Sequence, residues 1–328
     1  MRFKINSAEV KSLSFSANVK EEISQRFGNG IHCELAELSA IMNICGKISY
    51  FGEKNCLKIQ MENFVVVKKC FTILKKTLNI SSEIRVRSPK NGRGTRIYTL
   101  LLRDQAVIEK LLQRTGVGIY DGGRLRISNQ INPLMVQSIC CRRSYIRGAF
   151  LSVGSVTDPN KNYHLEFAFA KQNLSLDLQS LLYTFSLEAK IVERKEYFVV
   201  YMKEGEQIVN LLNIIEGHVA LMALENVRIL KEVRNDVNRK VNCETANLNK
   251  VVQAAVQQIE DISFIQNTVG LDSLSEPLQD IARLRLEYPD ASLKELGALS
   301  TESVGKSGVN HRLKKISQLA EDLRKGKR

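Results

Sequence analysis

The chain has 328 residues, a formal net charge of +13, and 44% hydrophobic against 25% charged residues. That length exceeds one ordinary domain, and the composition excludes a disordered chain, so we expect two folded domains. An excess of positive charge favours a polyanionic partner, with nucleic acid ahead of an anionic membrane surface. The alternative is a basic protein without such a role.

The chain shows no sign of membrane targeting or of metal binding. The N-terminus lacks a signal-peptide core, and no apolar run reaches the roughly 18 residues of a membrane span, so we expect a cytoplasmic, nucleoid-associated protein. The seven cysteines form no Cys-x-x-Cys pair and the four histidines are scattered. We therefore expect buried thiols, no disulfides, no metal and no cofactor.

Hydrophobic periodicity predicts alternating helices and hairpins from the N-terminus. Ser16 is a candidate cap for a first helix ending near Phe27, and residues 34–45 form a second helix. Two hairpins and two helices follow, at residues 47–61, 63–78, 83–102 and 104–114.

The same order of elements recurs later in the chain. A helix at residues 141–153 precedes strands 155–156 and 163–170, a helix 174–187, strands 191–194 and 197–202, and a helix 206–215. The matching first helices end at Gly46 and Gly154, and these two glycines define the offset between the copies. This predicts a pseudo-twofold αββαββα tandem repeat, with copies at about residues 30–115 and 137–216, in an α+β domain spanning residues 1–225.

The segments before these two glycines, residues 38–46 (LSAIMNICG) and 146–154 (IRGAFLSVG), resemble the motif helices of LAGLIDADG homing endonucleases. Small residues at Ala40, Gly148 and Ser152 are expected to let the two helices pack closely. In that family, the acid before each final glycine binds the catalytic metal, and the matching positions here are Cys45 and Val153. Valine offers no ligand and sulfur suits magnesium poorly, so we expect no catalytic residues and no enzyme activity. Nearby carboxylates that could replace the missing metal-binding acids are Glu34, Glu37 and Asp158.

The second hairpin carries a group of basic residues suited to DNA phosphates: Arg85, Arg87, Lys90, Arg93 and Arg96. The alternative is a charged edge strand that prevents aggregation.

The C-terminal part, residues 226–328, is predicted to be a helical linker followed by an all-α DNA-binding domain. The charged segment 228–240 is expected to be a hinge, with helices at residues 249–265 and 275–286 after it. Ser292 and Glu295 form a capping box that begins a short helix, a turn follows at residues 300–305, and a basic helix extends to about Arg324. This outline is typical of a helix-turn-helix.

The last helix presents residue types that suit a DNA major groove. Asn pairs with adenine and Arg with guanine, whereas lysines suit phosphates. The candidate DNA-binding residues are Lys306, Ser307, Asn310, His311, Arg312, Lys314 and Lys315. The alternative is an ordinary charged surface helix.

Residues 237–248 (VNRKVNCETANL) and 306–313 (KSGVNHRL) resemble signatures of the WhiA family, and similar strings extend along nearly the whole chain. The resemblance implies a degenerate LAGLIDADG-like domain joined to a helix-turn-helix, with roles in sporulation, cell division and chromosome segregation in Gram-positive bacteria. The turn at residues 300–305 departs from the family, which more often has a proline there.

Together these features predict a non-catalytic, sequence-selective DNA-binding transcriptional regulator. Its expected partners are double-stranded DNA and another transcription or cell-division protein, with no membrane contact, and we expect a monomer because a pseudo-dimer has no need to dimerise. Two alternatives remain open: a nucleoid-associated interaction protein whose endonuclease-like domain is a docking surface, and an active DNA endonuclease.

Overall fold

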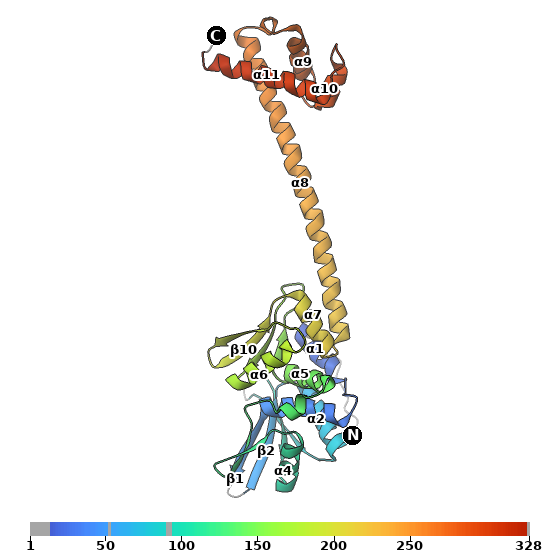
Figure 1. Cartoon of the computed structure of the whole chain (residues 1–328), viewed down its shortest axis with the longest axis vertical. Helices are drawn as coiled ribbons and strands as arrows, with labels where there is room; N and C mark the ends of the chain where they lie inside the picture. The colour runs from blue at the N-terminus through green and yellow to red at the C-terminus, as the bar shows by residue number, and fades with distance from the viewer. Residues whose placement is uncertain (1–13, 52–53, 90–93, 327–328) are drawn as a thin grey trace. The chain divides into compact units, whose positions relative to one another are not determined.

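The computed structural model describes residues 14–51, 54–89 and 94–326. The chain divides into two compact units, with unit 1 ending at Lys231 and unit 2 beginning at Glu232. This division falls shortly after the boundary at residue 225 that the sequence led us to expect. It lies inside one long helix, α8 (His218–Thr268), which is labelled in Figure 1.

Unit 1 contains the predicted tandem repeat. The first copy consists of α2 (Ile31–Cys45), β1 (Gly46–Phe51), β2 (Lys54–Met61), α3 (Phe64–Leu78), β3 (Glu83–Arg87), β4 (Ile97–Leu102) and α4 (Gln105–Arg114). The second consists of α5 (Ile139–Val153), β7 (Gly154–Val156), β8 (Leu165–Phe169), α6 (Gln172–Tyr183), β9 (Lys190–Arg194), β10 (Tyr197–Met202) and α7 (Gly205–Ile214). The α+β, αββαββα prediction is confirmed.

The two sheets share topology and register. Their strand orders are β1-β2-β4-β3 and β7-β8-β10-β9, and neighbouring strands in both sheets are antiparallel. Gly46 pairs with Ile59 in the first sheet, and Gly154 pairs with Phe167 in the second. The offset from Gly46 to Gly154 equals the offset from Ile59 to Phe167, so the repeat extends to individual strand pairs.

Helices α2 and α5 pack against each other at the centre of unit 1 (Figure 1). A Cβ atom added to Gly148 on α5 would lie 2.4 Å from the backbone oxygen of Glu37 and 3.0 Å from Cβ of Ala40, both on α2. The small residues at positions 148 and 40 therefore permit the close approach predicted from the sequence.

Local signals explain where the helices begin and end. The Asn63 side chain accepts a hydrogen bond from the Val65 amide at 2.8 Å and caps α3. Asn79 ends α3 in the left-handed region with φ of 52°. The intervening apolar residues join a continuous core beneath the first sheet, namely Val66, Val67, Cys70, Ile73 and Leu74.

Four elements of unit 1 differ from the prediction or extend it. Helix α1 (Phe15–Ser24) begins after Ser14, whose hydroxyl accepts from the Ala17 amide, so Ser16 is not its cap. Strands β5 (Gly118–Asp121) and β6 (Arg124–Ile127) form an additional hairpin, followed by η1 (Pro133–Val136). The turn of the β5–β6 hairpin contains Gly122 and Gly123 at φ of 57° and 77°, in the left-handed region that favours glycine.

Unit 2 packs the C-terminal part of α8 with η2 (Leu271–Ser273), α9 (Glu276–Glu287), α10 (Leu293–Leu299) and α11 (Lys306–Arg324). Its core is formed by Ile262, Ile265, Leu274, Ile281, Ala282, Leu296, Val309, Leu313, Ile316 and Ala320.

The charged segment 228–240, expected to lie between the two domains, contains the division between the units at Lys231 and Glu232, and it is helical within α8. The 51 residues of α8 contain neither glycine nor proline, and lysine, arginine and glutamate are good helix formers. A charged, exposed segment can therefore continue a helix instead of interrupting it. Among the described residues, no helix is both long and apolar enough to cross a membrane.

Candidate nucleic-acid interface

The predicted capping box fixes the start of α10. The Ser292 hydroxyl accepts from the Glu295 amide at 3.3 Å, and the Glu295 carboxylate accepts from the Ser292 amide at 2.7 Å. The hydrogen bond from the Ser292 amide, followed by one from the Ser292 side chain, lowers the pKa of the Glu295 carboxyl. Helix α10 is therefore started by a local signal that does not depend on its core contacts.

The turn between α10 and α11 is closed by very close packing. A Cβ on Gly297 would lie 2.0 Å from the Val304 oxygen, and one on Gly308 would lie 2.2 Å from Val304 Cγ1. The Val304 amide donates to the Gly297 oxygen at 3.0 Å, while Ser300 Oγ lies 2.9 Å from the Gly297 oxygen and 2.7 Å from the Glu302 oxygen and can donate its one hydrogen to either. This turn is stabilised without the proline expected from the family pattern.

Helix α9 anchors the same turn. The Thr301 amide and hydroxyl donate to the two carboxylate oxygens of Asp280 at 3.0 and 3.1 Å. The buried Arg285 on α9 donates to the backbone oxygens of Pro289 and Ala291, which precede α10. The three helices are thereby tied into one helix-turn-helix arrangement.

Helix α11 has one buried face and one polar face. Val309, Leu313, Ile316 and Ala320 point into the core of unit 2. The opposite face, at the three- and four-residue spacing of an α-helix, carries exposed Ser307, His311, Lys314 and Gln318, with exposed Lys315 beside them. Sequence reasoning did not include Gln318, although its spacing from His311 and Lys314 would have revealed it.

Two of the predicted base-reading residues lie on the flanks of this exposed face. Asn310 is half-buried, and together with exposed Lys306 it borders a groove beside α8 and α10 that also includes Leu248, Val252 and Leu293. Arg312 Nη2 lies 3.1 Å from Glu302 Oε2 in the turn, and only 18% of the Arg312 side chain is exposed. The structure therefore brings Ser307, His311, Lys314 and Lys315 together, and directs Asn310 and Arg312 elsewhere.

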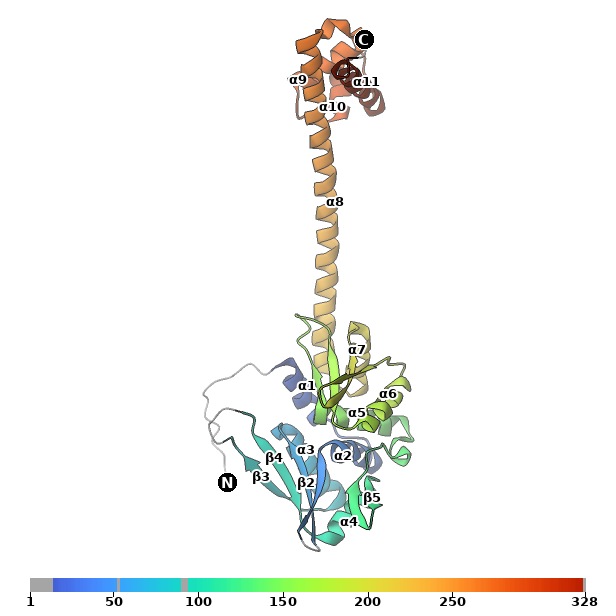
Figure 2. The same ribbon diagram turned by 90° about the vertical axis from the view of Figure 1, so that its left-hand side faces the viewer.

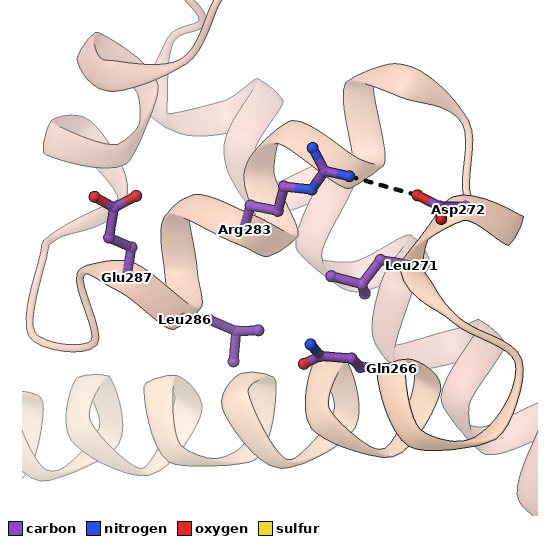
Figure 3. Close-up of a pocket in the computed structure, with 6 residues that line it drawn as sticks. All are labelled: Gln266, Leu271, Asp272, Arg283, Leu286 and Glu287. Carbon is purple, nitrogen blue, oxygen red and sulfur yellow. Dashed lines mark hydrogen bonds and ion pairs between the residues drawn. The ribbon is translucent and has the colours of Figure 1, made fainter.

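Unit 2 also has a polar hollow away from α11 (Figure 3). It is lined by Gln266, Leu271, Asp272, Arg283, Leu286 and Glu287. Arg283 Nη2 points toward Asp272 Oδ1 at 3.4 Å. Since its one cation is already paired, the hollow offers little to a phosphate.

The basic residues predicted on the second hairpin of unit 1 lie at or beyond a sheet edge. Strand β3 is the terminal strand of its sheet, next to β4 (Figure 2), and both Arg85 and Arg87 are exposed. Arg96 is also exposed, whereas Lys90 and Arg93 lie outside the described residues. The Glu83 carboxylate pairs with Arg85 at 2.8 Å, and this hydrogen bond lowers the pKa of Glu83.

The two sheets differ in charge on the face opposite the core. Since strand residues alternate between faces, Lys58, Arg85 and Thr99 lie opposite the buried Leu57, Ile59 and Leu100. The equivalent positions of the second sheet hold Glu166, Val192 and Val199. Glu166 is further paired with Arg194 at 3.3 Å. The first sheet therefore presents the more basic surface.

The ends of the two motif helices hold a thiol and an isopropyl group. Cys45 and Val153 are half-buried, and each is followed by the glycine that begins a strand. Burial raises the pKa of the Cys45 thiol to about 11, although a hydrogen bond with Ser152 and the charge of Lys20 act in the opposite direction. At neutral pH this side chain is a neutral thiol, which is a poor ligand for magnesium.

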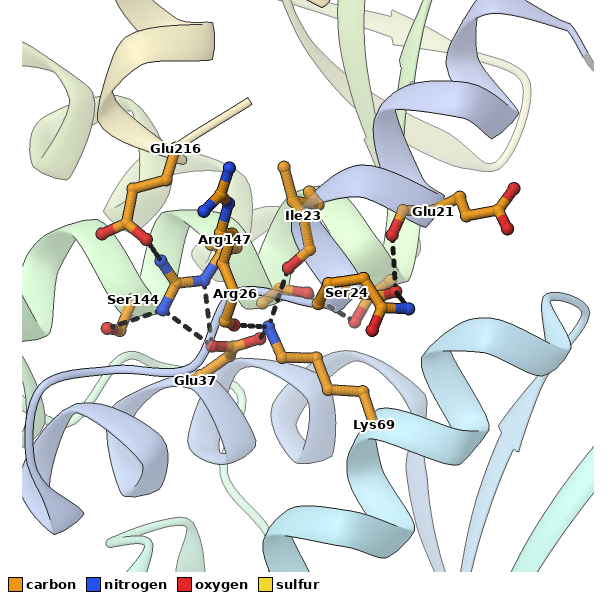
Figure 4. Close-up of polar contacts among 12 residues, drawn as sticks. Glu21, Ile23, Ser24, Arg26, Glu37, Lys69, Ser144, Arg147 and Glu216 are labelled. Carbon is orange, nitrogen blue, oxygen red and sulfur yellow. Dashed lines mark hydrogen bonds and ion pairs between the residues drawn. The ribbon is translucent and has the colours of Figure 1, made fainter. Parts of the chain in front are cut away.

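The nearby carboxylates are engaged in other contacts. Glu37 is fully buried between two cations: Arg147 Nη2 lies 3.0 Å from Oε2, and Lys69 Nζ pairs with Oε1 (Figure 4). Arg147 also contacts Glu216 at 3.0 Å, and Lys69 donates to the Ile23 oxygen at 3.0 Å. Burial lowers the pKa of the Lys69 ammonium, and Glu37 opposes that shift.

Glu34 and Asp158, the other two carboxylates that could replace the missing metal-binding acids, also have partners. Glu34 accepts a hydrogen bond from Thr77 and lies 3.5 Å from Lys76. Asp158 accepts from the amide and side chain of Asn160, and these bonds lower its pKa. Each of the three acids therefore has a structural contact in place.

Comparison with known proteins identifies the family. Three family models match in succession: the WhiA N-terminal LAGLIDADG-like domain over residues 31–118, the WhiA LAGLIDADG-like domain over 142–234, and the WhiA C-terminal HTH domain over 237–320. The chain belongs to the WhiA family. The "Probable cell division protein WhiA" of Lachnoclostridium phytofermentans is 48% identical over 95% of this chain and 100% of its own length. A WhiA protein of the same description from Alkaliphilus oremlandii is 46% identical over 96% of this chain and 99% of its own length.

A solved structure agrees with this assignment. The full-length DUF199/WhiA protein from Thermatoga maritima has 25% sequence identity and a TM-score of 0.59, covering 94% of this chain and 98% of that chain. The WhiA family predicted from residues 237–248 and 306–313 is therefore confirmed, as is a LAGLIDADG-like fold combined with a helix-turn-helix.

Proposed function

We propose that this chain is a non-catalytic, sequence-selective DNA-binding regulator of transcription that acts in cell division. The observation that carries the proposal is the exposed polar face of α11, where Ser307, His311, Lys314 and Gln318 lie in a row on a helix held by a helix-turn-helix. Hydroxyl, imidazole and amide groups can hydrogen-bond to base edges, and the lysines suit phosphates. The names of the WhiA relatives support the part in cell division.

Unit 1 has a supporting role in this proposal. The basic face of the first sheet supplies a second contact for DNA, and tethering it to the helix-turn-helix makes that contact effectively intramolecular. The engaged carboxylates and the Cys45 thiol support a binding role rather than cleavage. Roles in sporulation and chromosome segregation, nucleoid association and a monomeric state belong to the same proposal.

A binding experiment on the full chain tests this function. The chain is used to select duplexes from a random-sequence pool, and the binding of a selected duplex and of its scrambled version is titrated at several salt concentrations with magnesium present. We expect binding that falls steeply with salt, preference for the selected duplex, and uncut DNA.

Charge reversal separates direct readout from incidental contact. The double variant Lys314→Glu/Lys315→Glu should lose affinity and show a smaller salt slope, whereas Lys250→Glu on the exposed surface of α8 should change both much less. Equal losses per reversed charge in the two variants would favour nonspecific attraction by net charge. Full binding by the double variant would favour the interaction-protein alternative, and magnesium-dependent cuts would favour the endonuclease.

A further inference from the structure

Four side chains with soft or borderline metal-ligand atoms meet where α2 and α5 begin. They are His32 and Cys33 in the first turn of α2, and Cys140 and Cys141 in the first turn of α5. One ligand atom from each lies within 4.8 Å of the others. His32 Nδ1 is 3.2 Å from Cys141 Sγ and 3.3 Å from Cys33 Sγ.

These separations suit a single tetrahedral ion. With Zn–S bonds of about 2.3 Å and Zn–N bonds of about 2.0 Å, the ligand atoms of a tetrahedral zinc site are separated by roughly 3.5–3.8 Å. The four atoms are already close to that spacing, so small rotations of the side chains would complete the site. Three sulfurs and one imidazole form a common structural zinc set, whereas calcium and magnesium require oxygen ligands.

The surroundings favour the charge that such a site would carry. Three thiolates and one zinc ion sum to one negative charge, and the amino-terminal turns of two helices stabilise negative charge. Cys33 and Cys141 are buried, while Cys140 is exposed and gives a route from solvent. The Ser138 hydroxyl lies 3.2 Å from Cys140 Sγ and can hydrogen-bond to a ligating sulfur.

Two glycines before α2 leave room for the side chains of His32 and Cys33. A Cβ on Gly30 would lie 3.0 Å from Nε2 of His32, and a Cβ on Gly28 would lie 2.3 Å from Cβ of Cys33. The chain before α2 therefore passes close to both side chains, and the His32 ring lies with Nδ1 toward the sulfurs and Nε2 toward Gly30.

We propose that His32, Cys33, Cys140 and Cys141 bind one zinc ion that joins the first turns of the two motif helices. The spacing in the sequence did not reveal this group, because the His32–Cys33 pair and the Cys140–Cys141 pair belong to different copies of the repeat and lie far apart along the chain. The ion would link the two copies of the repeat at their central helix pair. Binding releases the thiol protons to solvent, so affinity should fall as the pH is lowered.

The test begins with the metal content of the full chain, purified without chelators and measured by plasma mass spectrometry. We expect one zinc per chain in the wild type and in Cys243→Ser, which removes an exposed cysteine outside the group. Cys140→Ser removes an exposed ligand, so little packing is lost. Even the loss of an outer-shell partner weakens metal binding about 10–100-fold, so this variant should bind zinc at least about tenfold more weakly.

Cobalt substitution and X-ray absorption provide independent readouts. Cobalt bound to the wild type should give the intense visible bands of a tetrahedral thiolate site, and these should be weaker in Cys140→Ser and His32→Ala but unchanged in Cys243→Ser. If Cys140→Ser does not fold, X-ray absorption at the zinc edge of the wild-type protein tests the proposal. We expect three sulfur ligands and one nitrogen ligand. Absence of bound metal, cobalt bands of equal intensity in all folded variants, a sulfur-free shell, or a disulfide between Cys33 and Cys140 or Cys141 would overturn the proposal.

Discussion

The Arg312 guanidinium lies 3.1 Å from the Glu302 carboxylate, so the arginine expected to read guanine is paired with the turn that precedes its own helix. Only 18% of the Arg312 side chain is exposed, compared with 74% of Glu302. This geometry favours a structural contact between the turn and α11. Neutralisation by Glu302 also reduces the attraction that Arg312 offers to a phosphate.

We therefore expect Arg312→Ala to weaken DNA binding less than Lys314→Ala. Loss of the Lys314 charge should cost about fivefold in affinity, equivalent to roughly 1 kcal/mol, and lower the salt slope by about one. Glu302→Gln should tighten binding by about threefold, because it removes a negative charge near the DNA and releases Arg312. Fluorescence anisotropy with a selected duplex measures all three. A larger loss in Arg312→Ala than in Lys314→Ala would mean that the ion pair opens on binding and that the guanidinium contacts DNA.

The close crossing of α2 and α5 makes Gly148 intolerant of a side chain. In Gly148→Ala the new Cβ would meet the Glu37 backbone oxygen at 2.4 Å, and a backbone atom inside a packed helix pair has little freedom to move. Alanine favours a helix by about 1 kcal/mol, but overpacking costs about 1–3 kcal/mol, so we expect net destabilisation of unit 1.

Tyrosine fluorescence during urea unfolding measures this effect, because eight of the nine tyrosines precede residue 232 and only Tyr288 lies in unit 2. Gly205→Ala is the matched control in unit 1, since its nearest neighbour is the flexible Arg228 side chain at 3.3 Å. An unfolding midpoint for Gly148→Ala equal to or above that of Gly205→Ala would show that the helices can separate at little cost.

The buried Glu37 is expected to stabilise unit 1 strongly through its two cations. Glu37→Gln keeps the shape of the side chain but leaves Lys69 and Arg147, whose side chains are each 1% exposed, without the carboxylate charge. Breaking a buried pair in this way typically costs about 3–5 kcal/mol. The urea midpoint of the tyrosine signal should fall accordingly.

Glu83→Gln is the control, because Glu83 is an exposed partner of Arg85 on the edge strand. Its unfolding midpoint should stay close to that of the wild type. Similar small changes for both variants would indicate that water or another group compensates for Glu37.

The sequence predicted the repeated fold because its signals are local. Strand alternation, helix caps and the two motif glycines act over short stretches of chain, so each copy could be recognised separately. The continuity of α8 does not follow from charge, because a charged, exposed segment is typical both of a linker between domains and of a solvent-exposed helix; the signal that indicates a continuous helix is the absence of glycine and proline. The β5–β6 hairpin has strands too short to give a clear alternating pattern.

The candidate DNA-binding face was predictable only in part for a related reason. Helical spacing placed Ser307, His311 and Lys314 together. The half-burial of Asn310 depends on the packing of α8 beside α11, and the pairing of Arg312 depends on the path of a turn. Such tertiary contacts leave no periodic pattern in the sequence.

Cys45 provides a test of the electrostatics at the end of α2. Burial raises its pKa to about 11 from an ordinary value of 9.0, so the folded chain holds this proton more tightly than the unfolded chain. The stability that it contributes is fully present below about pH 9 and is lost as the pH rises through about 11.

Alkylation by iodoacetamide, which requires the thiolate, should therefore be slow for Cys45 at pH 8 and should accelerate about tenfold per pH unit toward pH 11. Peptide mass spectrometry follows this rate beside that of the exposed Cys243 in the same sample. Equal rates at pH 8, or a Cys45 rate that stops rising near pH 9, would contradict the raised pKa and reopen this position as a thiolate metal ligand.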